Sequence, residues 1–205
     1  MVEFKGYDRL VNFTDAVVAI AATLLILPVV DAATHVTRND ADTFIRQVMP
    51  QLLMFLLSFA VIANFWLEHH RLFRRIDKFD TTLIVLNFVW IVGIVVMPVP
   101  TALIVKGNSH DSLAVAFYIG TMFVISLFQW LMNVHTRRRP ELEHEHDKAH
   151  TRILGDTISA VYLAIAFVVG VLVPQIGLLS LLIMFLIPLT VRIIRAVQSR
   201  RTAVA

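Results

Sequence analysis

Arg9, Asp15 and Thr23 are polar side chains in an otherwise mostly apolar stretch, RLVNFTDAVVAIAATLLILPVV at residues 9–30. The stretch is long enough to cross a bilayer, since a helical span needs roughly 20 residues. Ionisable groups at membrane depth are costly, so they normally face a protein interior or an aqueous path. The pattern therefore predicts a helix with one face turned away from lipid, as in a pore or transport protein.

One stripe of this helix carries the side chains that could line a pore. Ile20, Leu24, Leu27 and Asp31 recur at spacings of four, three and four residues, and Thr23 lies beside them. Bulky aliphatic side chains can form a narrow constriction that gates by dewetting. Thr23 would supply a hydroxyl or release a carbonyl toward an ion, and Asp31 would raise the local cation concentration at the outer mouth. Alternatively, the same spacing would let these residues simply pack a helix bundle.

Arg9 and Asp15 need polar partners, and the second apolar segment offers Asn64, Trp66, His69 and His70. Trp66 and His70 are four residues apart, so they share a helix face. A cluster of these groups would lock two helices together, and His70 could make it sensitive to pH. The alternative is an interfacial belt, because Trp and basic residues favour the headgroup level. For Trp66 and His69 taken alone, the belt is favoured.

Other polar groups suggest structural roles rather than chemistry. Asn87 lies inside the third apolar segment and predicts a hydrogen bond across helices. Pro98 and Pro100 predict a kink or the end of a helix. The histidines of ELEHEHDKAH lie in a charge-dense stretch that favours a solvated helix or loop over a metal site, namely His144, His146 and His150. The sequence has no HExxH, GxSxG, P-loop or Gly-rich dinucleotide turn, so we expect neither an enzyme nor a cofactor.

Composition places all of these residues in a membrane protein. The 205 residues are 58% hydrophobic and only 16% charged, with a mean hydropathy of +0.75. Soluble domains are usually about 45–50% apolar and about 25% charged. The net charge of +3 could indicate nucleic acid, but the basic residues cluster in particular loops, which is typical of membrane topology. There is no cysteine, which excludes disulfides and thiolate chemistry.

Six apolar segments predict six transmembrane helices in one domain that spans residues 1–205, and no pore loop of the TVGYG type interrupts them. We place the segments at about 10–30, 45–67, 81–105, 112–134, 153–174 and 177–194. The sequence shows no clear inverted repeat and no clearly discontinuous helix. All but three of the 18 basic side chains fall on one side of this arrangement, the exceptions being Arg38, Arg46 and Lys106. The positive-inside rule then places both termini in the cytoplasm.

The first helix carries a recognisable motif. The pattern Arg9-x-x-x-Phe13-Thr14-Asp15 followed by AVVAIAATLLIL resembles the RxxxFSD signature of the transmembrane protein 175 family of endosomal/lysosomal potassium channels and their prokaryotic relatives. FWLEHHRLF in the second segment and N-x(10)-P-x-P-T in the third are similar to that family too. Thr14 stands where the family usually has Ser, and the hydroxyl is kept. The single six-helix unit resembles the prokaryotic branch, which assembles as tetramers.

The resemblance implies an all-α homotetramer in the cell membrane, with the pore lined by the first helix of each subunit. Ile20, Leu24 and Leu27 match the family's hydrophobic constriction, and Thr23 matches its pore threonine. The residues that match the family's polar network are Arg9, Phe13, Thr14, Asp15, Trp66 and His70. The implied function is a leak channel for potassium, with modest selectivity and with K+ as the permeant ion. A proton-permeable channel or a proton-coupled transporter is the alternative, and no nucleic-acid partner is expected.

Overall fold

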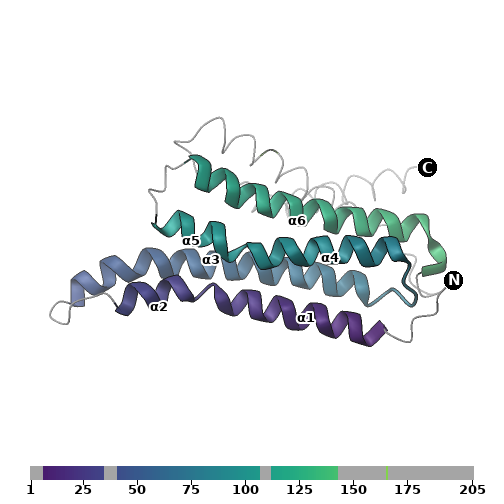
Figure 1. Ribbon diagram of the computed structural model, residues 1–205, viewed down its shortest axis with the longest axis horizontal. Coiled ribbons are helices and arrows are strands. Elements are labelled where there is room, and N and C mark those ends of the chain that lie inside the picture. The colour runs from purple at the N-terminus through teal and green to yellow at the C-terminus, as the bar shows by residue number, and fades with distance from the viewer. Residues whose placement is uncertain (1–6, 35–40, 107–111, 143–164, 166–205) are drawn as a thin grey trace, which may run out of the picture.

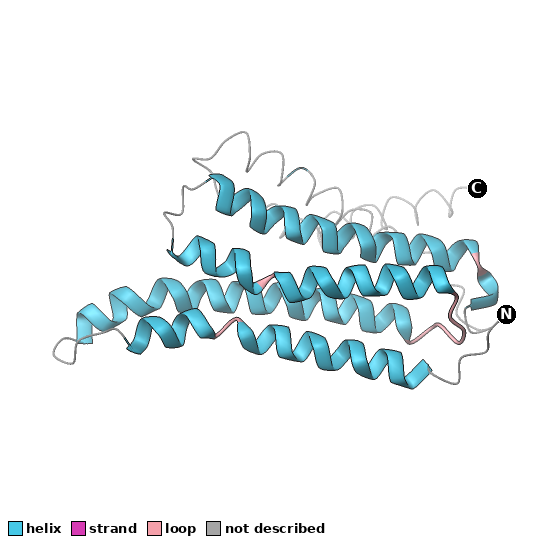
Figure 2. Ribbon diagram, viewed as in Figure 1, coloured by secondary structure: helices cyan, strands magenta, loops and turns pink. Residues whose placement is uncertain are grey.

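The computed structural model describes residues 7–34, 41–106, 112–142 and the single residue 165. All regular structure in these residues is helical, and the long helices lie side by side as an elongated bundle (Figures 1 and 2). The elements are α1 Tyr7–Leu24, α2 Leu27–Thr34, α3 Ala41–Phe73, α4 Thr81–Val96, α5 Pro98–Lys106, α6 Ser112–Arg138 and the short 3-10 helix η1 Pro140–Leu142. The all-α prediction is therefore confirmed for the described residues.

Four stretches of the described chain are long and apolar enough to cross a membrane: Arg9–Thr34, Val48–Phe73, Thr81–Val105 and Leu113–Arg138. They correspond to the first four predicted spans. The second span continues to Phe73 instead of ending near residue 67, because its basic end stays helical. The predicted spans at 153–174 and 177–194 lie outside the described residues.

Two of the four spans are discontinuous, and proline explains both breaks (Figure 2). Pro28 has no N–H for the carbonyl of Leu24, and its ring crowds that carbonyl, so α1 ends at Leu24 and α2 begins at Leu27. Pro98 ends α4 in the same way, as predicted. The expectation that no span is clearly discontinuous is wrong, because Pro28, near the end of the first apolar run, breaks the helix.

The core lies between α4 and α6, which contribute several of the largest fully buried side chains, among them Trp90, Tyr118 and Met122. Gly93 lets the two helices approach closely. A Cβ atom added at Gly93 would lie 2.6 Å from Cγ1 of Ile125, which is too close for any real contact. α4 is apolar on every face, so its remaining surface, such as Val85 and Val92, is exposed on the bundle.

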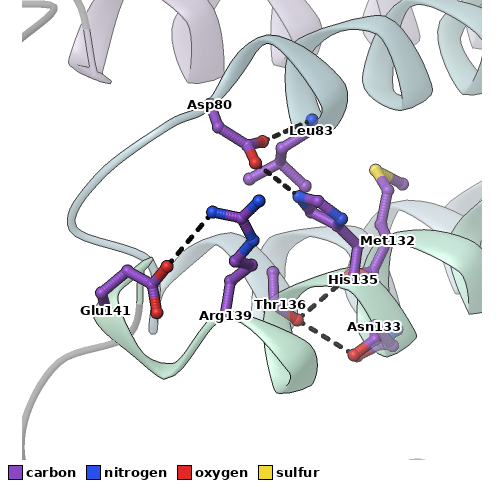
Figure 3. Close-up of polar contacts among 8 residues, drawn as sticks. All are labelled: Asp80, Leu83, Met132, Asn133, His135, Thr136, Arg139 and Glu141. Atoms are coloured by element: carbon purple, nitrogen blue, oxygen red, sulfur yellow. Dashed lines mark hydrogen bonds and ion pairs between the residues drawn. The ribbon is translucent and has the colours of Figure 1, made fainter. Parts of the chain in front are cut away.

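A polar clasp joins the start of α4 to the end of α6 (Figure 3). Asp80 is the N-cap of α4: its Oδ1 accepts a hydrogen bond from the backbone N–H of Leu83 at 2.8 Å, and its Oδ2 accepts one from His135 Nε2 at 2.7 Å. The Arg139 guanidinium lies between the carboxylates of Asp80 and Glu141, 3.4 Å from Glu141. Burial raises the pKa of the Asp80 carboxyl group. The hydrogen bonds from Leu83 and His135, with the charges of His135 and Arg139, outweigh burial and hold this pKa below its ordinary value.

We predict that Asp80 stabilises the fold in a pH-dependent way. Its folded pKa is lowered, so its contribution is fully present above the unfolded pKa and is lost as pH falls through the folded pKa. Asp80→Asn keeps an N-cap acceptor but removes the charge, so wild type should unfold at a higher temperature than the variant near neutral pH. The two curves should converge in acid. A temperature difference that persists unchanged at pH below the folded pKa would contradict this account.

Candidate functional site

The residues predicted to line a pore share the exposed face of the first span. Ile20 is 60% exposed, Leu24 is 41% and Leu27 is 57%, and Thr23 and Asp31 are exposed beside them. We call these five residues the exposed face. The opposite side of the same span packs against the bundle through Thr14, Val18, Ala21, Leu25 and Val29. Among the described residues, the aliphatic stripe is therefore not packed inside the bundle.

The composition of the exposed face does not suit lipid alone. Thr23 and Asp31 lie on it, and Asn12 is exposed one turn below Ala16. Polar groups directed at hydrocarbon are costly, so they normally face protein or water. Of the four spans, the first has the smallest share of its apolar window buried inside the chain, 22%. The face is thus suited to contact with something other than lipid, such as water, an ion or another subunit.

The break between α1 and α2 lies within the exposed face and changes its chemistry. Residue 28 is proline, so the carbonyl of Leu24 has no helical N–H partner. The N–H of Ile26 turns back to the carbonyl of Thr23 at 3.3 Å. The Thr23 hydroxyl donates to the carbonyl of Ile20 at 2.7 Å, which directs its proton into the helix. The Thr23 hydroxyl oxygen and the Leu24 carbonyl oxygen can still accept, and oxygen atoms are the ligands that a hard cation prefers.

Asp15 and Trp66 meet as the predicted polar network requires. The indole Nε1 of Trp66 donates to Asp15 Oδ1 at 2.8 Å, and the Trp66 ring stacks on His70 with the centroids 5.3 Å apart. Arg9 is exposed and makes no ion pair or hydrogen bond with another side chain in the part of the chain that the structure describes. Phe13 is also exposed, with its ring 6.1 Å from Phe88. Among the described residues, Arg9 is thus the member of the predicted network that has no side-chain partner.

A second polar chain, buried in the bundle, ties the first span to two others. His69 Nε2 donates to Asn87 Oδ1 at 2.7 Å, Asn87 Nδ2 donates to Thr14 Oγ1 at 3.1 Å, and Thr14 Oγ1 donates to the carbonyl of Leu10 at 2.9 Å. We assign the proton to His69 Nε2 because an amide oxygen can only accept. The hydrogen bond across helices predicted for Asn87 is thereby confirmed.

His69 is placed differently from the sequence-based interpretation. Its side chain is 1% exposed and lies between the rings of Phe73 and Trp90, with centroids 4.2 and 4.3 Å away. The interfacial belt is therefore wrong for His69. Asn64, a suggested partner for Arg9 and Asp15, is exposed on α3. Sequence spacing could not separate the two adjacent histidines, because which of them faces the core depends on how α3 packs against α4.

A third buried cluster was missed by the sequence analysis. The hydroxyl of Thr101 is 3.1 Å from Ser58 Oγ and 2.8 Å from the carbonyl of Met97, and Ser58 Oγ is 3.1 Å from the Tyr118 hydroxyl. The cluster joins α3, α5 and α6 at the break beside Pro98. The presence of three hydroxyl side chains inside apolar spans is the sequence signal that could have predicted this cluster. Among the described residues, no group of three His, Cys, Asp or Glu could hold a metal ion, and the histidines at 144, 146 and 150 lie outside them.

The fold and the exposed face define the class of this protein: it is a multi-pass helical membrane protein whose first span has an exposed, partly polar face. The family model "Endosomal/lysosomal potassium channel TMEM175" matches residues 9–98. Over these residues the chain resembles the TMEM175 family, which is a family of ion channels and not of enzymes. The resemblance drawn from the first-helix motif is thereby confirmed.

Related proteins support the same placement. A potassium channel of Chamaesiphon minutus is 32% identical over 122 residues, which cover 58% of this chain and 60% of the relative. The endosomal/lysosomal proton channel TMEM175 of Homo sapiens is 33% identical over 102 residues, which cover 48% of this chain but only 19% of the relative. The matched part of the zebrafish relative, from Danio rerio, is 26% of its length. The chain thus spans about a quarter or less of the animal proteins and about 60% of the Chamaesiphon relative.

Solved structures share the fold. The crystal structure of a lysosomal potassium-selective channel TMEM175 homologue from Chamaesiphon minutus superposes with a TM-score of 0.69 at 21% identity, covering 90% of this chain and 97% of that one. A variant of the potassium channel MtTMEM175, solved in complex with a nanobody fusion protein, gives a TM-score of 0.66 at 18% identity and covers 94% of this chain and 93% of that one. At these identities the likeness concerns the fold alone.

We predict that Asn87→Leu destabilises the fold. The substitution leaves His69 and Thr14 buried without their partner, which should cost about 1–3 kcal/mol in free energy of unfolding. Thermal unfolding in detergent measures the loss, and Asn64→Leu, at an exposed position on α3, is the matched control. Replacing all three partners with apolar residues (Asn87→Leu, His69→Phe and Thr14→Val) should recover much of the loss. Equal melting temperatures for wild type and Asn87→Leu would contradict the importance of this chain.

Proposed function

We propose that this chain is the subunit of a potassium-permeable leak channel that conducts cations passively. The observation that carries the proposal is the exposed face, where three large aliphatic side chains lie on the outside of the first span together with Thr23 and Asp31. Bacterial relatives named as potassium channels support potassium as the permeant ion. The proposed unit is one domain over residues 1–205 with six spans.

Four copies of the exposed face around one axis would enclose a pore. Rings of Ile20, Leu24 and Leu27 offer no hydrogen bonds, so water leaves a narrow passage between them and conduction depends on its width. Thr23 lies at the same level, with its oxygen lone pairs and the nearby Leu24 carbonyl available to a partly dehydrated cation. Asp31, near the far end of α2, raises the local concentration of cations at the mouth.

The homotetramer is part of the proposal, because the described residues leave Ile20, Leu24 and Leu27 exposed and give Arg9 no side-chain partner. In a closed ring each subunit repeats the same contact, so a partner that the neighbouring subunit offers to Arg9 is offered in all four copies. Asp15, Trp66 and His70 form the polar group at the same end of the bundle, and Arg9 reaches toward that group in the neighbouring subunit. The ring is proposed to lie in the cell membrane with both termini in the cytoplasm, as the basic loops indicate.

A second candidate function is proton permeation or proton-coupled transport. Two observations favour it: relatives in animals are named proton channels, and two spans are discontinuous, as is common in secondary transporters. A potassium gradient across liposomes separates the candidates. A leak channel passes potassium without any coupled ion, whereas a coupled transporter moves potassium only together with protons. Reconstituted protein that passes no cation under any gradient would overturn the channel proposal.

Two adjacent leucines provide a direct test of the constriction. Leu24 lies on the exposed face, whereas Leu25 is 1% exposed in the core. Leu24→Ala widens and hydrates the proposed ring, so cation flux should rise and potassium preference should weaken, and Ile20→Asn should do the same. Leu25→Ala leaves a cavity, which should cost about 2–5 kcal/mol of stability without raising flux per folded channel. A loss of stability at Leu24 with unchanged permeation would place the pore elsewhere.

Arg9 tests the assembly. Arg9→Ala should lower the fraction of tetramers in native mass measurements in mild detergent, since it removes the proposed contact between subunits. Arg46→Ala is the matched control, because Arg46 makes only an exposed ion pair with Asp42 on its own helix. A wild-type protein that runs as a monomer under conditions that preserve its fold would contradict the tetramer.

A further inference from the structure

In the part of the chain that the structure describes, one end of the bundle carries more basic than acidic side chains. The segments at the end of α3 and the end of α6 contain seven basic residues: Arg71, Arg74, Arg75, Lys78, Arg137, Arg138 and Arg139. Arg71 pairs with Glu68, Arg139 lies 3.4 Å from Glu141, and Arg75 and Arg137 each have a partner. The acidic groups are engaged as well, since Asp80 accepts from His135 and Asp77 has its own partner.

Three cations remain beside these pairs: Arg74, Lys78 and Arg138. All three are exposed, and their side chains make no ion pair with any residue in the described ranges. An exposed cation without a partner is ordinary by itself. Three of them in two segments that the fold holds together form a concentrated positive surface, which we call the basic surface.

Backbone hydrogen bonds hold the two segments in place. The N–H groups of Asp77 and Lys78 both donate to the carbonyl of Leu142, at 2.8 and 3.4 Å. The ring of Phe79 lies 5.7 Å from Phe73, which anchors the loop between α3 and α4 to the apolar core. The loop that carries Arg74 and Lys78 is therefore tied both to η1, which closely follows α6, and to the span before it.

The position of the basic surface matches the headgroup layer of a bilayer. Arg74 directly follows a span that ends at Phe73, Lys78 lies three residues before the span that begins at Thr81, and Arg138 is the last residue of the fourth. The headgroup region on each side of a bilayer is only about 5–7 Å thick. A loop pinned at both ends to spans stays near that layer, where long Arg and Lys side chains reach lipid phosphates.

We propose that Arg74, Lys78 and Arg138 form a binding surface for the phosphate groups of anionic phospholipids. Arginine matches phosphate with two parallel hydrogen bonds, and lysine adds a point charge. A bound lipid would bridge the α3–α4 loop and the end of α6 beside the Asp80 clasp. The fold already joins these two segments, and the lipid would strengthen the junction.

The test compares the wild-type chain with Arg74→Gln/Lys78→Gln/Arg138→Gln. Phosphatidylglycerol added to protein in phosphatidylcholine nanodiscs should raise the melting temperature of wild type and leave bound-lipid adducts in native mass spectra. Each basic residue near a membrane surface contributes a similar increment of attraction, so the triple variant should bind phosphatidylglycerol roughly a hundredfold more weakly. The control is Arg38→Gln/Arg46→Gln/Lys106→Gln, which removes the same charge from the three basic residues that the sequence assigns to the other side of the membrane.

Several results would overturn the proposal. Equal phosphatidylglycerol shifts for wild type and the basic-surface variant would show that the three cations do not bind the lipid. An equal loss in the control variant would show that net charge alone matters. A full shift produced by millimolar inorganic phosphate without anionic lipid would assign the surface to a soluble phosphate. Melting in pure phosphatidylcholine shows whether the variant folds, so that a misfolded protein is not mistaken for a weak binder.

Discussion

The hydrogen bond between Asn87 and Thr14 is the interaction on which the arrangement of the first span most depends. It joins α1 to α4, and His69 extends it to α3, so one buried chain sets the rotation of three spans about their axes. In hydrocarbon, polar groups have no water to turn to, so an unpartnered amide there is costly. Thr14 must therefore face inward, and a helix that turns Thr14 inward turns Ile20, Leu24 and Leu27 outward.

The proline breaks act on the face that this rotation exposes. A continuous helix would use every carbonyl internally and present only side chains, whereas Pro28 leaves the Leu24 carbonyl without a helical partner beside Thr23. Pro98 makes the corresponding break in the third span, where buried hydroxyls from Ser58, Thr101 and Tyr118 occupy the polar space. The break in the first span lies at the surface of the subunit, whereas the break in the third span is buried inside it. This difference places the chemistry of the first span at a surface and that of the third span inside the subunit.

Charged residues at the ends of the spans divide into two groups. Asp80 caps α4 and binds His135, so the start of one helix and the end of another move as a unit. The cations used in such contacts are distinct from Arg74, Lys78 and Arg138, which face outward. Arg9 likewise has no side-chain partner among the described residues. Interactions inside the subunit and those proposed with a neighbour or with lipid therefore use different residues, so variants can separate them.

Sequence by itself determined the placement of the first four spans and the stripe that holds Ile20, Leu24, Leu27 and Asp31, whereas the structure selected Trp66 as the partner of Asp15. The spans and the stripe follow from local rules, since apolar length and helical period do not depend on distant contacts. Only the tertiary structure decided that His69 is buried while His70 stacks on Trp66, and that the aliphatic stripe lies on the outside. Adjacent residues differ by about 100° around a helix. A modest rotation of the helix about its axis, which the bond between Asn87 and Thr14 fixes, therefore decides which residues are buried and which are exposed.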